Sequence, residues 1–132
     1  MIEPLHFVLD TGVLIAAESR ERWALRFFDL RARGLASLTI PRVCVVEWWA
    51  SRTDRREKIL ASANAVEPLS DDIAKAAGVA RAKIKGAGAI DAVVMATAAL
   101  RGAIVVTRDV GDFAALATYF RGVRLYGRPP SA

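Results

Sequence analysis

The stretch HFVLDTG, residues 6 to 12, decides the expected fold. Its first four residues form a short apolar run, typical of a buried strand, and the run ends at the acidic residue Asp10. Thr11 and Gly12 then predict a turn, and a helical pattern begins at Val13. A strand that leads through a turn into a helix is the opening unit of a chain in which strands and helices alternate.

The alternation continues along the rest of the chain. Further helices are expected at residues 21–33, 42–51, 53–63, 70–85 and 90–101. Further strands are expected at residues 35–40, 103–107 and 123–126, with a brief extended link at 65–69 and a tail at 128–132. Pro41 suits the first position of a helix, Ser70 suits an N-cap, and Gly34 and Gly102 suit helix ends. This pattern predicts an α/β fold with a mainly parallel central sheet between two layers of helices.

The composition supports one globular domain over residues 1–132. Hydrophobic residues make up 54% of the 132 residues, which is enough for one core but not comfortably for two. Cys44 is the single cysteine, so it forms neither an internal disulfide nor a cysteine-based metal site. The sequence shows no signal peptide and no apolar run approaching the roughly 20 residues of a membrane span. We therefore expect a cytoplasmic protein in which any metal is held by oxygen ligands.

The charge balance favours a polyanionic partner. Nineteen Lys and Arg residues against fourteen Asp and Glu residues give a formal net charge of +5 and a pI near 10.0. Acidic residues nevertheless follow two of the expected strands. Asp10 comes directly after the first strand, and Asp109 lies two residues after the strand that ends at Thr107. Open α/β sheets bind ligands beyond the carboxyl ends of their strands, so the two carboxylates are expected at one functional edge.

Four groups of residues, in this order, resemble the PIN domain and, within it, the VapC-type toxins of bacterial toxin-antitoxin pairs. They are Val8 to Gly12, Ile40-Pro41 leading to Glu47, Ile90-Asp91-Ala92 with Ala96 to Ala98 behind it, and Val106 to Asp109 with Asp112-Phe113. The resemblance spans nearly the whole chain. It implies a three-layer α/β/α PIN-like fold and a Mg²⁺- or Mn²⁺-dependent ribonuclease.

The resemblance also assigns roles to individual residues. It implies that four acidic residues are catalytic and bind the metal: Asp10, Glu47, Asp91 and Asp109. It implies that Thr11, Thr107, Arg108 and Asp112 position the site or the substrate. The last acidic position stays open, because Asp112 offers a second carboxylate close to Asp109. Further implied properties are an RNA substrate, a homodimer, and a cognate antitoxin whose C-terminal segment covers the acidic pocket.

The chemistry of phosphodiester hydrolysis suits such an acidic group. The reaction needs charge neutralisation on the phosphate and an activated water, and one or two Mg²⁺ ions supply both. Mg²⁺ prefers hard oxygen ligands, usually a few carboxylates together with water. Without a cation, the gathered carboxylates would raise one another's pKa and repel RNA.

Other interpretations of the same residues remain open. Asp10 could simply cap the helix that follows it, and Asp91 could be a charge that favours a helix N-terminus. A non-catalytic RNA-binding or scaffold module would have the same fold. A response-regulator-like domain fits less well, because it needs adjacent acidic residues after the first strand and a lysine after a later one. This chain has one such aspartate, and no lysine follows an expected strand.

Overall fold

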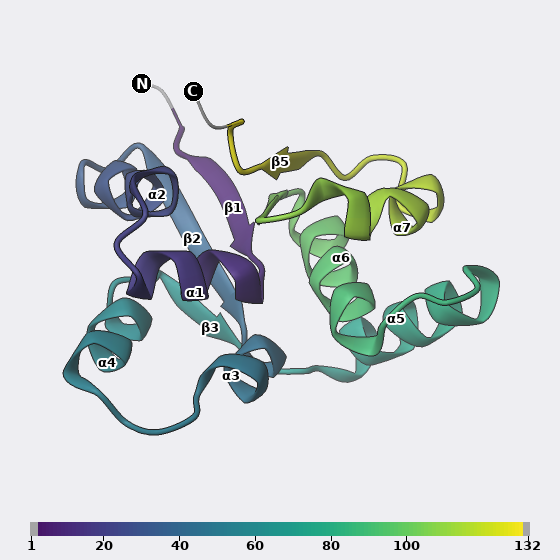
Figure 1. Cartoon of the computed structure of the whole chain (residues 1–132). Coiled ribbons are helices and arrows are strands. Elements are labelled where there is room, and N and C mark those ends of the chain that lie inside the picture. The colour runs from purple at the N-terminus through teal and green to yellow at the C-terminus, as the bar shows by residue number, and fades with distance from the viewer. Residues whose placement is uncertain (1–2, 131–132) are drawn as a thin grey trace.

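The computed structural model describes residues 3–130, in which five parallel strands form one sheet (Figure 1). The strands are β1 (Leu5–Leu9), β2 (Ala36–Pro41), β3 (Ala65–Glu67), β4 (Ile104–Thr107) and β5 (Leu125–Gly127). Their order across the sheet is β3-β2-β1-β4-β5, and every neighbouring pair is parallel. The predicted α/β class with a parallel sheet is confirmed, and all five carboxyl ends lie at one edge.

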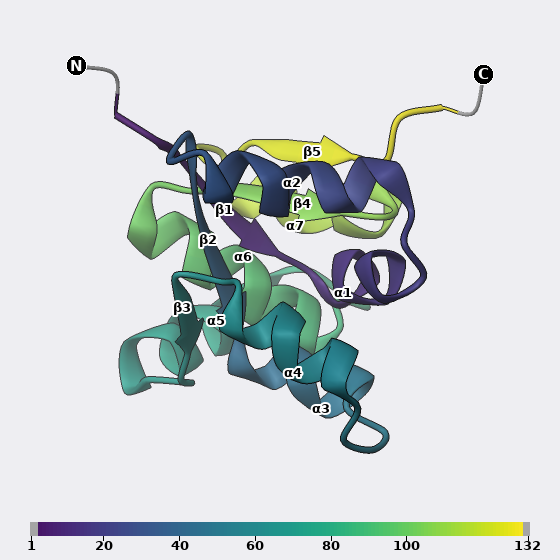
Figure 2. The ribbon, with the colours of Figure 1, turned by 90° about the vertical axis from the view of Figure 1, so that its left-hand side faces the viewer.

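Helices cover both faces of this sheet (Figures 1 and 2). They are α1 (Thr11–Glu18), α2 (Arg22–Ala32), α3 (Arg42–Trp48), α4 (Asp54–Ala61), α5 (Asp71–Lys83), α6 (Ala89–Arg101) and α7 (Ala114–Tyr119), with a 3₁₀ turn η1 (Val110–Phe113). Figure 1 shows α1, α2 and α4 on one side of the sheet and α5, α6 and α7 on the other. The fold is therefore the predicted three-layer α/β/α arrangement. No helix among the described residues is long and apolar enough to cross a membrane.

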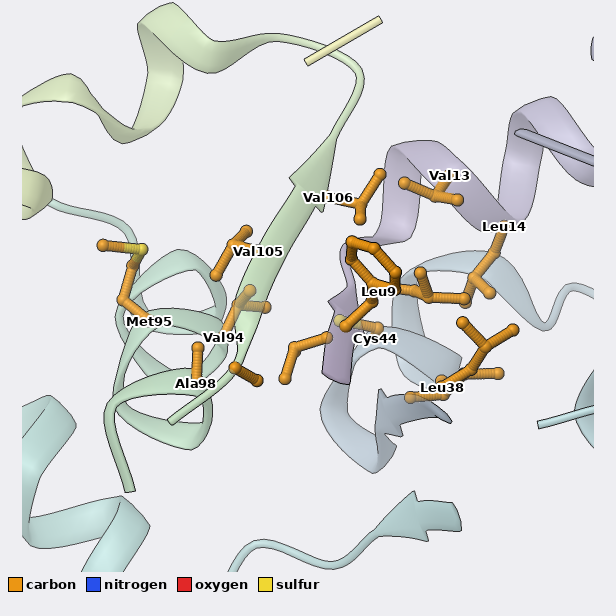
Figure 3. Packing of buried hydrophobic residues seen from close by; sticks show 14 of the residues in the cluster. Leu9, Val13, Leu14, Leu38, Cys44, Val94, Met95, Ala98, Val105 and Val106 are labelled. Atoms are coloured by element: carbon orange, nitrogen blue, oxygen red, sulfur yellow. The ribbon is translucent and has the colours of Figure 1, made fainter. Parts of the chain in front are cut away.

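The core fills the space between the sheet and each helix layer (Figure 3). Leu9 in β1 and Val105 and Val106 in β4 are completely buried. Leu14 packs from the α1 side, and Met95 packs from the α6 side. Consecutive strand residues are buried because a parallel sheet is covered on both faces. This burial holds the two central strands firmly and fixes the places where their carboxyl ends emerge.

Local signals explain several helix boundaries. The Ser70 hydroxyl accepts a hydrogen bond from the Ile73 backbone N–H at 3.2 Å, which confirms the predicted N-cap of α5. Gly102 ends α6 with a φ of 63°, a left-handed conformation that glycine adopts without strain. The Thr53 hydroxyl caps α4 in the same way as Ser70, by accepting from the Arg56 backbone N–H at 3.1 Å.

Several predicted boundaries were wrong. Pro41 is the last residue of β2 and the N-cap of α3, because the strand pairing with Glu67 extends over it. Helix α3 ends at Trp48, since Trp49 leaves the helical region with a ψ of 80°. Two elements, η1 and α7, were not predicted, because their short segments between Val110 and Tyr119 lack a clear periodicity. Strand β5 begins at 125 because residues 120–123 form a turn, and the predicted tail is described only to residue 130.

Candidate active site

The two central strands bring Asp10 and Thr107 together at the carboxyl edge of the sheet. The Asp10 backbone N–H donates to the Val106 carbonyl at 3.0 Å, which continues the pairing of β1 with β4 beyond the last strand residue. The Thr107 hydroxyl donates to Oδ2 of Asp10 at 3.0 Å. Thr107 is buried and Asp10 is half-buried, so this bond fixes one carboxylate at the rim of the core.

Helix α3 contributes Glu47 to the same edge. The buried Thr11 hydroxyl, in the first turn of α1, donates to Oε1 of Glu47 at 2.7 Å. Glu47 itself is exposed, although its neighbours Cys44 and Trp48 belong to the core. Thr11 therefore orients an exposed carboxylate from a buried position, next to Asp10 in the chain.

Four carboxylates at this edge of the sheet affect the ionisation of Asp10 and Asp91. Burial, followed by the negative charges of Asp10, Asp112 and Glu47 in that order, raises the pKa of Asp91 to about 6. Burial also raises the pKa of Asp10, and the charges of Glu47 and Asp112 add to this effect. The backbone N–H of Thr11 and the hydroxyl of Thr107 act in the opposite direction on Asp10. The structure thus brings together Asp10, Glu47, Asp91 and Asp112.

Asp109 lies differently from these four residues. Its carboxylate accepts a hydrogen bond from the Gly111 backbone N–H at 2.9 Å and so caps η1. Its backbone N–H donates to the Thr107 hydroxyl at 3.2 Å, so only its main chain joins the hydrogen bonds around Asp10. Asp109 is not among the charges that raise the pKa of Asp91. Of the two carboxylates in this turn, that of Asp112 acts on the pKa of Asp10 and Asp91.

The acidic residues offer oxygen ligands for a metal but do not by themselves form a complete coordination shell. Within residues 3–130, no three Asp, Glu, His or Cys side chains stand close enough together to hold one ion directly. Mg²⁺ usually keeps several waters and takes only one or two protein carboxylates. The donor set, four carboxylates of which two have raised pKa values, fits a hydrated divalent cation of this kind.

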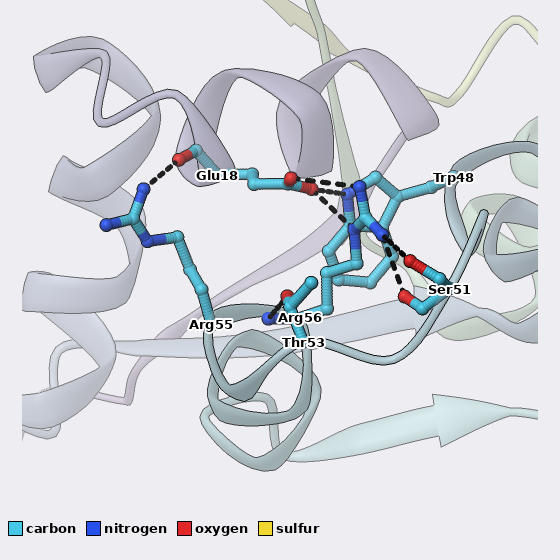
Figure 4. A network of polar contacts seen from close by, with 6 residues as sticks. All are labelled: Glu18, Trp48, Ser51, Thr53, Arg55 and Arg56. Carbon is cyan, nitrogen blue, oxygen red and sulfur yellow. Dashed lines mark hydrogen bonds and ion pairs between the residues drawn. The ribbon is translucent and has the colours of Figure 1, made fainter.

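A polar network behind the site holds helices α1, α3 and α4 together (Figure 4). The Glu18 carboxylate accepts from Trp48 Nε1 at 2.8 Å and from Arg56 Nε at 2.9 Å. Arg56 also donates to the Ser51 carbonyl at 2.7 Å, and Arg55 donates to the Glu18 carbonyl at 2.8 Å. Since Trp48 follows Glu47, the network anchors the end of the helix that carries Glu47. The predicted helix over residues 53–63 gave no indication of this role of Arg56.

The family model of the PIN domain matches residues 7–118 of this sequence. The chain belongs to the PIN domain family. The predicted resemblance is thereby confirmed, and the matched segment contains all four acidic residues of the site. PIN domains are generally nucleases.

Solved structures with this fold include several complexes. The PIN domain described above is similar to a chain of VapBC2 from Rickettsia felis bound to a DNA fragment from its promoter, with a TM-score of 0.72 and 15% identity over 95% of this chain and 100% of that one. A chain of DNA-bound VapBC from Salmonella typhimurium gives a TM-score of 0.67 and 20% identity over 93% of this chain and 98% of that one. A chain of a toxin-antitoxin complex from Klebsiella pneumoniae gives a TM-score of 0.59 and 27% identity over 81% of this chain and 89% of that one. No curated protein matches the sequence.

Proposed function

We propose that this PIN domain is a Mg²⁺- or Mn²⁺-dependent endoribonuclease and the toxin of a VapBC-type pair. The observation that carries the proposal is the gathering of Asp10, Glu47, Asp91 and Asp112 at the carboxyl edge of the sheet, where burial and then their mutual charges raise the pKa of Asp10 and Asp91. A basic chain with net charge +5 is suited to an RNA substrate, and an acidic group within it is suited to a cation.

Each acidic residue has a distinct part in this proposal. Asp10 and Asp91 are the half-buried carboxylates and are proposed as direct metal ligands. Glu47, held by the Thr11 hydroxyl, and Asp112 are exposed and complete the set through water. We assign the last acidic position to Asp112 rather than Asp109, because the charge of Asp112 acts on Asp10 and Asp91 whereas the Asp109 carboxylate caps η1 through the Gly111 N–H.

The protein groups prepare the site for hydrolysis. A bound divalent cation supplies charge neutralisation on the phosphate and lowers the pKa of water. Thr107 holds Asp10 in one orientation, and Thr11 does the same for Glu47. Above a pH of about 6, Asp91 is ionised and available to a cation. His6, the single histidine, lies within β1, so this chain offers no histidine at the site as a general base.

A groove between α1, α2 and α4 supports the antitoxin as the partner. It encloses about 570 Å³, with Leu25, Phe28 and Ile59 as apolar lining and Arg20 and Lys58 among its polar residues. The solved structures of similar chains include toxin-antitoxin complexes. We propose that the C-terminal segment of the antitoxin, with apolar and acidic side chains, lies in this groove and reaches the acidic site.

The proposed homodimer and cytoplasmic location rest on the family resemblance. Val46 offers an apolar contact for a second copy, since 80% of its surface is exposed on α3 beside Glu47. Sedimentation velocity of the wild-type protein and of Val46→Asp measures this contact. A dimer that dissociates in the variant is expected, whereas a wild-type monomer would contradict the dimer.

Cleavage of RNA tests the function. A labelled cellular RNA pool is incubated with wild-type protein and with Asp10→Asn, each in Mg²⁺, Mn²⁺ or EDTA. Cutting is expected with either metal, and it should disappear in EDTA and in the variant. RNA binding without cutting would instead support a non-catalytic RNA-binding module. The observation that favours this second candidate is that no three acidic, histidine or cysteine side chains among the described residues lie close enough to hold one ion directly.

A further inference from the structure

A second, polar pocket lies at the carboxyl ends of β4 and β5, beside the acidic group. It encloses about 310 Å³ and is lined by Arg108, Asp109, Arg128, Pro129 and Pro130. Strand β4 ends one residue before Arg108, and β5 ends one residue before Arg128. Because the two strands are parallel neighbours, their first residues beyond the sheet meet at one place. Two guanidinium groups therefore line the same pocket.

The packing at Gly127 fixes this pocket relative to the acidic residues. A Cβ atom at Gly127 would lie only 2.4 Å from Cγ2 of Val110. Val110 belongs to η1, between Asp109 and Asp112. The end of β5 thus packs directly on the turn that presents Asp112 to the acidic group. The Arg128 pocket and the acidic group are held as two parts of one surface.

Arg108 has hydrogen-bonding capacity left over. Its Nε is buried and has no partner among the described residues. One terminal nitrogen donates weakly to the Gly12 carbonyl, at 3.4 Å. An arginine guanidinium carries five N–H donors in a planar fork that matches the oxygens of a phosphate. A buried donor without a partner destabilises the protein. An anion bound at this guanidinium would supply hydrogen-bond acceptors that the described residues do not provide.

We propose that Arg108 and Arg128 form a subsite for a backbone phosphate of single-stranded RNA, next to the phosphate that is cleaved. This inference rests on the proposed nuclease function. The acidic group repels the RNA backbone until a cation is bound, and an adjacent cationic pocket offsets that repulsion. Asp109 is the one carboxylate in the pocket, and its hydrogen bond to Gly111 directs it into the η1 cap. The two guanidiniums leave the pocket with a positive balance.

Arg124 provides a matched control for Arg128. Both are exposed arginines that flank β5, Arg124 before its first residue and Arg128 after its last. Since all strands are parallel, Arg124 lies at the opposite edge of the sheet from the acidic group. Replacing either residue by alanine removes the same charge from the same strand, and only the distance to the acidic edge differs.

The experiment measures binding of fluorescein-labelled, mixed-sequence single-stranded RNA to the full chain in EDTA, over a range of salt concentrations. Arg128→Ala is expected to weaken binding about fivefold and to reduce the slope of log K against log salt by about 0.7. Arg128→Glu should weaken RNA binding further, and Arg128→Lys should weaken it less than Arg128→Ala does. Arg124→Ala should bind RNA as wild type does. With metal present, the effect of Arg128→Ala is expected in KM.

The possible failures are distinguishable. If wild type cleaves RNA but Arg128→Ala binds it no worse than Arg124→Ala, the subsite is refuted while the nuclease stands. If wild type neither binds nor cleaves RNA, the proposed function fails and the subsite falls with it. A labelled oligoglutamate peptide serves as the other probe. If Arg128→Ala weakens peptide binding but leaves RNA binding unchanged, the pocket serves protein carboxylates and the RNA subsite is overturned.

Discussion

The Thr107 hydroxyl donates a hydrogen bond to the Asp10 carboxylate, 3.0 Å away in space and 97 positions away in the sequence. Together with the hydrogen bond from the Asp10 N–H to the Val106 carbonyl, it links the ends of the two central strands. Hydrogen bonding to the ionised form of a carboxyl group lowers its pKa, and Thr107 does so for Asp10 against the larger opposing effect of burial. The bond therefore keeps Asp10 oriented and more readily ionised.

Replacing Thr107 by valine is expected to destabilise the protein by about 1–2 kcal/mol, since the hydroxyl also accepts from the Asp109 N–H. The pKa of Asp10 should rise further, because a donor to its ionised form is lost. The acid limb of the pH–rate profile for RNA cleavage should then move to higher pH. Thr107→Ser retains the hydroxyl and is the control. An unmoved acid limb in Thr107→Val would show that Asp10 does not govern it.

A divalent cation is expected to raise the thermal midpoint of unfolding more at pH 8 than at pH 5. The raised pKa of Asp91, about 6, exceeds the usual unfolded value near 3.9. Its contribution to stability is thus present below the unfolded pKa and lost as the pH rises through 6. A cation counteracts that loss, and protons compete with it below pH 6. Calorimetry of wild type and Asp91→Asn with Mn²⁺ measures this, and an equal shift in both would exclude Asp91 as a ligand.

Replacing Asp109 by asparagine and replacing Asp112 by asparagine are expected to have different effects on the rate of RNA cleavage. Asp112→Asn removes a charge that acts on Asp10 and Asp91, so cleavage should fall about 100-fold. Asp109→Asn still offers an oxygen to the Gly111 N–H and should retain cleavage near the wild-type rate. Initial rates at saturating Mg²⁺ decide between them. The reverse order of effects would assign the ligand to Asp109, as the sequence first suggested.

The close approach of Gly12 to Arg108 is expected to make position 12 intolerant of any side chain. A Cβ at Gly12 would lie 2.8 Å from Cβ of Arg108, which has little freedom to move. Gly12→Ala should therefore cost about 1–3 kcal/mol and reduce cleavage. Gly78→Ala, in α5 with open space around it, should stabilise by about 0.5–1 kcal/mol. Urea unfolding of both variants measures the contrast, and a harmless Gly12→Ala would contradict this packing.

The Glu18 network is expected to stabilise the fold more than an exposed ion pair does. Hydrogen bonds from Arg56, followed by Trp48, hold the pKa of Glu18 below its usual value. Glu18→Gln should cost about 1–3 kcal/mol at neutral pH. Asp29→Asn in the exposed Asp29–Arg33 pair should cost less than about 1 kcal/mol.

The Glu18 contribution has a defined pH dependence. It is present above the unfolded pKa of glutamate and is lost as the pH falls through the lowered folded value. Urea unfolding of wild type and Glu18→Gln at pH 7 and at pH 3 checks this. A difference between the two proteins that stays the same at both pH values would contradict the ionic character of the network.

The acidic edge of the sheet was predictable from the sequence, because the residue at which a strand ends can be recognised from its immediate neighbours in the chain. The apolar runs before Asp10 and Asp109 located both strands, and parallel pairing implied their common edge. The orientation of each side chain beyond the strands was not accessible in this way. Whether Asp109 or Asp112 joins the acidic group depends on the η1 cap, a turn of four residues without periodicity. The Glu18–Arg56 pair likewise joins residues 38 positions apart, which spacing alone does not reveal.

Anomalous diffraction from crystals of the wild-type protein soaked in Mn²⁺ tests the proposed metal centre most directly. The expected result is a peak between the carboxylates of Asp10 and Asp91, with Glu47 and Asp112 around it, that disappears in crystals of Asp10→Asn. A peak at Asp109 alone, or no peak in this acidic group at a Mn²⁺ concentration that supports RNA cleavage, would contradict it.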